Sequence, residues 1–119
     1  MNIVIVSKVI GGVRPVPIGI DRGGNIFKGT LSGALKNNLK EKLSEEKIDC
    51  NIEVDRTYDN CETMVKRGVN LILVSPYVKD KVDMDRVHKN HLYVLSEKEF
   101  NKGYVENIVE YIKNNLRSL

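Results

Sequence analysis

The segment KGTLSG, residues 28–33, combines residue types that can hold an anion. It leads into a helical pattern, where unpaired backbone N–H groups and the positive end of the helix dipole attract negative charge. The lysine adds charge, the hydroxyls can donate hydrogen bonds, and the glycines let a ligand approach the backbone closely. The sequence therefore predicts an anion-binding loop that comprises Lys8, Lys28, Gly29, Thr30, Ser32 and Gly33.

The same residues exclude two common nucleotide-binding motifs. A Walker A loop needs a glycine followed by a lysine and a hydroxyl residue, whereas this chain has Lys28, Gly29 and Thr30 in another order. No G-x-G-x-x-G follows the first strand pattern, which removes the dinucleotide fingerprint. A simpler interpretation stays open, in which Thr30 only caps the helix and the glycines only form turns.

The segment that contains this loop is the most basic part of the chain. Residues 7–33 hold seven of the nine glycines, and their net charge of +3 equals that of the whole protein. Apolar residues at alternate positions 16, 18 and 20, the turn letters DRGG, and a returning apolar pair favour a β-hairpin. We expect this hairpin, inserted at about residues 8–28, either to present Arg14 and Arg22 to a protein partner or a second copy, or to fold back on its own domain.

Short apolar runs alternate with helical patterns along the rest of the chain, which is typical of β-α units around a parallel sheet. Runs rich in β-branched residues predict buried strands, and leucines spaced four apart predict the first helix. Asp59 or Asn60 is expected to cap the second helix, and Gly68 to end it. The expected strands cover residues 2–6, 50–55, 70–75 and 91–95, and the expected helices cover residues 31–47, 61–67, 80–90 and 104–116.

Four strands and four helices in strict alternation predict a single α/β domain over residues 1–119. Because crossovers between parallel strands are right-handed, we expect a four-stranded parallel sheet of order 2-1-3-4 with helices on both faces. Ligands of such sheets bind beyond the carboxyl ends of the strands, at the switch point between the first and third strands. The glycine-rich segment leaves the first strand there. Tyr77, after the third strand, would line the same edge, either as a further partner-binding residue beside Arg14 and Arg22 or only as a surface aromatic residue.

Composition narrows the class of protein. An isoelectric point of 8.8 without dense Lys/Arg clusters or stacking aromatics does not favour nucleic acid. The start of the chain lacks a charged leader, and no apolar run reaches about eighteen residues. We therefore expect a cytoplasmic protein that does not insert into a membrane.

Cys50 and Cys61 are expected to be small buried thiols. His88 and His91 lack a third ligand, so neither a metal nor a cofactor is expected.

Without the hairpin, the chain resembles enzyme IIB of the lactose/cellobiose class of the sugar phosphotransferase system. The likeness covers nearly all residues outside about 8–28. It rests on the order and spacing of four segments, NIVIVS, GTLSGALKNNLKEKLSEEKIDCNIEVD, NLILVSPYVKDKV and LYVLSEKEFNKGYVENIVEYI. The resemblance implies a phosphoryl group carried on a cysteine after the first strand, received from enzyme IIA and passed to a sugar.

The residue at that cysteine position is Ser7. A serine hydroxyl is far less acidic than a thiol and needs an adjacent base, whereas both histidines are expected at the opposite, amino end of the sheet. We therefore expect a non-catalytic binding or regulatory module on an enzyme IIB-like scaffold, with an enzyme IIA-like or other protein as its partner. The alternative is a phosphotransferase that uses Ser7 as its phosphoryl acceptor.

Overall fold

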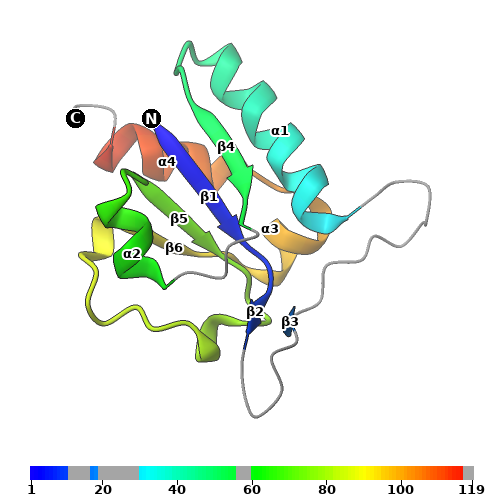
Figure 1. Ribbon diagram of the computed structural model, residues 1–119. Helices are drawn as coiled ribbons and strands as arrows, with labels where there is room; N and C mark the ends of the chain where they lie inside the picture. The colour runs from blue at the N-terminus through cyan, green and yellow to red at the C-terminus, as the bar shows by residue number, and fades with distance from the viewer. Residues whose placement is uncertain (11–16, 19–29, 56–59, 117–119) are drawn as a thin grey trace.

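The computed structural model describes residues 1–10, 17–18, 30–55 and 60–116. Four parallel strands form its central sheet, in the order β4-β1-β5-β6 (Figure 1). The α/β class and the predicted order 2-1-3-4 are confirmed, and the carboxyl ends of β1 and β5 lie side by side. The strands are β1 (Asn2–Val6), β4 (Asn51–Val54), β5 (Leu71–Val74) and β6 (Leu92–Val94).

β1 lies inside the sheet because its side chains are apolar on both faces. Ile3 stands in register with Ile52 of β4 on one side and with Leu71 of β5 on the other. Ile3 and Ile5 belong to the core on one face of the sheet, and Val4 and Val6 belong to the core on the other face. A shift by one residue would exchange the two sets, so packing on both faces holds the register of β1.

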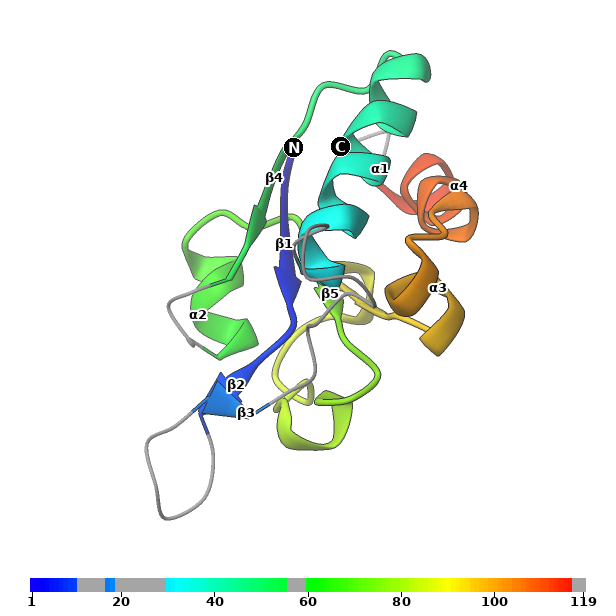
Figure 2. The same ribbon diagram turned by 90° about the vertical axis from the view of Figure 1, so that its right-hand side faces the viewer.

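Helices cover both faces of the sheet. α1 (Leu31–Glu45), α3 (Glu97–Lys102) and α4 (Glu106–Asn115) lie on one face, and α2 (Cys61–Lys66) lies on the other (Figure 2). The leucine spacing explains the orientation of α1, because three leucines on one side of the helix are fully buried against the first face. They are Leu35, Leu39 and Leu43.

Local capping bonds define the ends of α1 and α2. At the start of α1, Thr30 Oγ1 accepts a hydrogen bond from the Gly33 N–H at 3.0 Å. At the start of α2, Asn60 Oδ1 accepts one from the Thr63 N–H at 2.8 Å. α2 ends before Gly68, whose φ of 104° lies in the left-handed region that glycine adopts at no steric cost. The capping role of Asn60 and the end at Gly68 agree with the sequence prediction.

The third crossover differs from the prediction. In place of a helix over residues 80–90, the chain forms two 3-10 turns, Lys79–Lys81 and Lys89–His91, joined by irregular structure. Asp83 Oδ1 accepts a hydrogen bond from the Asp85 N–H at 3.1 Å, and such local bonds compete with helical pairing. α3, which follows β6, was not predicted. The strict alternation of four strands and four helices was therefore wrong.

Beyond β1 the chain forms a small antiparallel pair that projects from the body of the protein (Figure 1). β2 (Val9–Ile10) pairs with β3 (Pro17–Ile18). The predicted hairpin had its turn at the letters DRGG, residues 21–24, and that turn and its returning strand lie outside the described residues. The structure therefore describes an earlier pairing within the same segment.

Candidate functional site

The carboxyl edge of the sheet is the candidate site, because three elements bring hydroxyl side chains to it. Ser7 directly follows β1 and is 2% exposed, and Ser75 directly follows β5 and is fully buried. α1 begins at the same end of the sheet, next to the end of β1 (Figure 1). Ser32, in its first turn, is 1% exposed. The hydroxyls of these three serines are therefore largely closed to solvent, whereas Thr30, the N-cap of α1, is exposed.

The first turn of α1 already uses part of its capacity to bind an anion. Besides accepting from the Gly33 N–H, Thr30 Oγ1 lies 3.3 Å from Ser32 Oγ, within hydrogen-bonding distance. A Cβ atom at Gly33 would lie 2.9 Å from Thr30 Oγ1, so a larger residue would disturb this cap. Thr30 thus performs the capping role of the simpler interpretation, and Gly33 makes room for it.

The remaining basic residues of the predicted site are only partly described. Lys8 is exposed directly after Ser7, so its ammonium group is accessible to a ligand at this edge. Lys28, Gly29, Arg14 and Arg22 lie outside the described residues. Their contribution to an anion site or a docking surface stays a prediction from the sequence.

Tyr77 lies at the predicted edge but is held by other residues of the protein. Its ring packs edge-on against Phe100 of α3, with 5.9 Å between ring centroids. Its hydroxyl accepts a hydrogen bond from Asn101 Nδ2 at 2.6 Å, and its N–H donates to Ser75 Oγ at 3.2 Å. Tyr77 therefore joins the end of β5 to α3, and only part of its side chain is left for a partner.

α3 is the element of this edge that sequence reasoning missed. Ser96 and Glu99 form a capping box, in which Ser96 Oγ accepts from the Glu99 N–H and Glu99 Oε1 accepts from the Ser96 N–H at 2.9 Å. Glu99 is 3% exposed, and its Oε2 accepts a hydrogen bond from the Tyr93 hydroxyl at 2.7 Å. Burial and this bond raise the pKa of Tyr93 above its usual range. The S-x-x-E spacing of Ser96 and Glu99 is typical of a capping box, and this spacing in the sequence predicts the start of a helix here.

Both histidines lie at the amino end of the sheet, as expected. His91 lies just before β6, and its Nδ1 atom lies 2.9 Å from the carbonyl oxygen of Asn70, which precedes β5. His88 Nδ1 accepts a hydrogen bond from the Asn90 N–H within its own turn. The described part of the chain also contains no group of three or more His, Cys, Asp or Glu side chains placed to hold a metal ion. Neither histidine is in a position to act as a base for Ser7.

The two cysteines are protonated thiols at neutral pH. Cys61, the first residue of α2, is 1% exposed, and its pKa is raised to about 11 by burial and by the carboxylates of Asp83 and Asp55. Cys50, before β4, is half-buried rather than fully buried, and burial is the main cause of its raised pKa. Since the thiolate is the nucleophilic form, neither residue is activated for transfer chemistry.

The buried thiol of Cys61 makes stability depend on pH in the alkaline range. Because its pKa rises from 9.0 to about 11 on folding, its contribution is fully present below pH 9 and is lost as the pH rises toward 11. Denaturant unfolding should therefore show a smaller alkaline loss for Cys61→Ala than for wild type. Because the pKa of the less buried Cys50 is also raised, Cys50→Ala should reduce the alkaline loss less than Cys61→Ala does. Equal slopes for wild type and Cys61→Ala would contradict the assignment.

Comparisons of the chain with protein-family models, with curated proteins and with solved structures found no match. In the described ranges no helix combines the length and the apolar character needed to cross a bilayer. The candidate site is therefore interpreted from its own residues and their contacts.

Proposed function

We propose that this protein is a non-catalytic binding or regulatory module whose carboxyl edge receives an anionic group of a protein partner. The observation that carries this proposal is the burial of Ser7, which is 2% exposed at the position that matches the phosphoryl acceptor of enzyme IIB. In-line transfer of a phosphoryl group needs an accessible nucleophile and a base to receive its proton. A buried hydroxyl, with both histidines at the other end of the sheet, supports binding better than transfer.

The cysteines support the same proposal. A phosphocysteine route needs a thiolate, and the raised pKa of Cys61 keeps its thiol protonated at neutral pH. Cys50 precedes β4 and so lies at the amino end of its strand, away from Ser7. Among the described residues, neither cysteine therefore supplies an activated thiol in place of the phosphoryl-accepting cysteine of enzyme IIB.

Charge supports an anionic partner. Residues 7–33 carry the whole net charge of +3, and the remainder of the chain is neutral. Lys8 is exposed directly after Ser7, and the positive end of the 15-residue helix α1 lies at the same end of the sheet. The resemblance to enzyme IIB makes a phosphorylated enzyme IIA-like protein the first partner to test.

Incubation with phosphorylated enzyme IIA, followed by intact mass measurement, separates binding from transfer. We expect no added phosphoryl group on wild type. A phosphorylated product that disappears in Ser7→Ala would overturn the proposal and establish Ser7 as a phosphoryl acceptor.

Titration calorimetry with the same partner tests the docking surface. Exposed charge pairs each contribute up to about 1 kcal/mol, so the double variant Arg14→Ala, Arg22→Ala should weaken binding roughly ten- to thirtyfold. The matched control is Lys40→Ala, Lys47→Ala, which removes two exposed positive charges from the other end of α1. Equal affinity of the two double variants would contradict a docking role for the basic segment.

A further inference from the structure

The outer edge of β4 carries backbone groups that β1 does not use. Asn51 N–H donates to the Met1 carbonyl and Asp55 N–H to the Ile5 carbonyl, both at 2.8 Å. Odd-numbered residues of this strand therefore turn their backbone groups toward β1, and Ile52 and Val54 turn theirs outward. β4 is the terminal strand of the sheet, and no other described strand pairs with its outer side (Figure 2).

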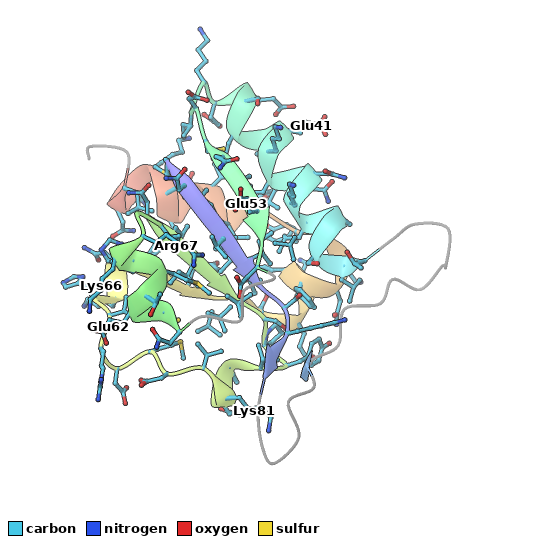
Figure 3. The ribbon with its side chains drawn as sticks, in the orientation of Figure 1. Glu41, Glu53, Glu62, Lys66, Arg67 and Lys81 are labelled. Carbon is cyan, nitrogen blue, oxygen red and sulfur yellow. The ribbon has the colours of Figure 1, made fainter. Side chains whose placement is uncertain are left out.

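The side chains of β4 alternate between exposed polar residues and buried or partly buried apolar residues at this edge. Asn51 and Glu53 are exposed, and Figure 3 shows Glu53 on the side of the sheet that carries α2. Ile52 is buried on the opposite side, under α1, while Cys50 and Val54 beside it are only partly buried against the same core. The edge thus combines an apolar row that is only partly buried with backbone groups that no described strand pairs.

We propose that β4 pairs antiparallel with β4 of a second copy of this chain, about a two-fold axis at Ile52. In this register Asn51 stands opposite the partner's Glu53, and Glu53 opposite the partner's Asn51, so an amide meets a carboxylate twice. On the other face Cys50 meets the partner's Val54, and the half-covered apolar row becomes continuous. The interface is isologous, as a two-fold axis requires.

The charges of β4 select this register over its neighbours. When two copies of β4 pair antiparallel through their outward backbone groups, even-numbered residues face even-numbered residues of the partner and odd-numbered residues face odd-numbered ones. An axis at position 53 would place Glu53 opposite the partner's Glu53, whereas the axis at Ile52 opposes no like charges within Asn51–Val54. Axes at 51 and 54 would each oppose only one residue of the strand to a strand residue of the partner. Directly opposed like charges are destabilising, so the axis at Ile52 is favoured.

The paired segment is short. It ends at Cys50 and Val54, because the next positions would place Asp49 against the partner's Asp55. So small a contact resembles a weak or transient interface rather than an obligate one. We therefore expect a dimer that forms reversibly as the protein concentration rises.

Charge substitutions at an exposed position test the register without disturbing the core. Asn51→Glu would place two carboxylates opposite each other twice, and Asn51→Lys would place an ammonium group opposite a carboxylate twice. Sedimentation velocity over a concentration series measures the dimer. We expect wild type to dimerise and Asn51→Glu to stay monomeric. Asn51→Lys should dimerise at a lower protein concentration than wild type, and added salt should reduce this difference. Asn37→Glu, on the exposed side of α1, is the control and should behave as wild type.

Cross-linking tests the geometry independently. Residues opposed through hydrogen bonds have Cα atoms about 5.5 Å apart, which suits a disulfide. In a Cys61→Ala background, Val54→Cys should therefore form a disulfide-linked dimer through Cys50, whereas Glu53→Cys, on the opposite face, should not. A wild type that is monomeric at every concentration, equal behaviour of Asn51→Glu and Asn51→Lys, or equal cross-linking of the two cysteine variants would each overturn the proposal.

Discussion

Replacement of Phe100 with alanine should lower the free energy of unfolding by about 3–5 kcal/mol, the usual range for a fully buried phenylalanine. Phe100 is the largest fully buried side chain of the protein's described part, and it packs into the core between the sheet and α1, α3 and α4. Its ring also supports Tyr77 at the carboxyl edge. The variant should therefore lose stability and loosen the wall of the candidate site together.

Denaturant unfolding followed by circular dichroism measures this loss. Asn101→Ala is the matched control on the same helix, because Asn101 is exposed and loses only its hydrogen bond to Tyr77. That bond contributes about 0.5–1.5 kcal/mol. Similar losses in the two variants would show that Phe100 is not the anchor of α3.

Glu99→Ala is expected to cost about 2–4 kcal/mol, because the variant removes two hydrogen bonds to a buried carboxylate. The hydroxyl of Tyr93 would lose its acceptor, and the Ser96 N–H would lose its partner in the capping box. Glu99→Gln keeps one acceptor oxygen, so its loss of stability should be smaller.

Glu97→Ala provides the control for Glu99, since Glu97 is an exposed residue in the same first turn. Its loss should stay within about 0.5 kcal/mol, as is usual for surface substitutions. Thermal or denaturant unfolding of the three variants at neutral pH makes the comparison. If Glu99→Ala proved as stable as Glu97→Ala, the buried network around Tyr93 would have no role in stability.

The sheet could be predicted because its strands have strong local signals. The run NIVIV reads as a strand covered on both faces, and β1 spans Asn2–Val6 with all but its first residue buried. In β4, the alternation of apolar and polar letters predicts a one-sided edge strand, and Asn51 and Glu53 are indeed exposed at the edge. Strand order then follows from the handedness of crossovers, which leaves few alternatives.

The third crossover and α3 could not be read from periodicity. Val82, Met84 and Val87 suggest a helical face, yet they pack half-buried against the core from irregular chain. Tertiary contacts there outweigh a weak helical preference. α3 is only six residues long and is too short for a hydrophobic period, so its capping box was the one local signal.

The candidate site was predictable in position but not in accessibility. The sequence correctly indicates that Ser7 ends β1 and that Thr30 precedes α1. Ser7 is 2% exposed. The contacts of Tyr77 with Phe100 and Asn101 depend on α3, which brings together residues more than twenty positions apart. Such contacts leave no spacing signal in the sequence.

The central position of β1 has a consequence for synthesis on the ribosome. β1 is the first strand to emerge, but its two neighbours, β4 and β5, are made later, and β5 ends at Val74. Until then the nascent chain carries an apolar strand whose edges are unpaired, and such strands are prone to aggregate. Productive folding of the nascent protein therefore depends on keeping β1 from other chains until β5 has been made.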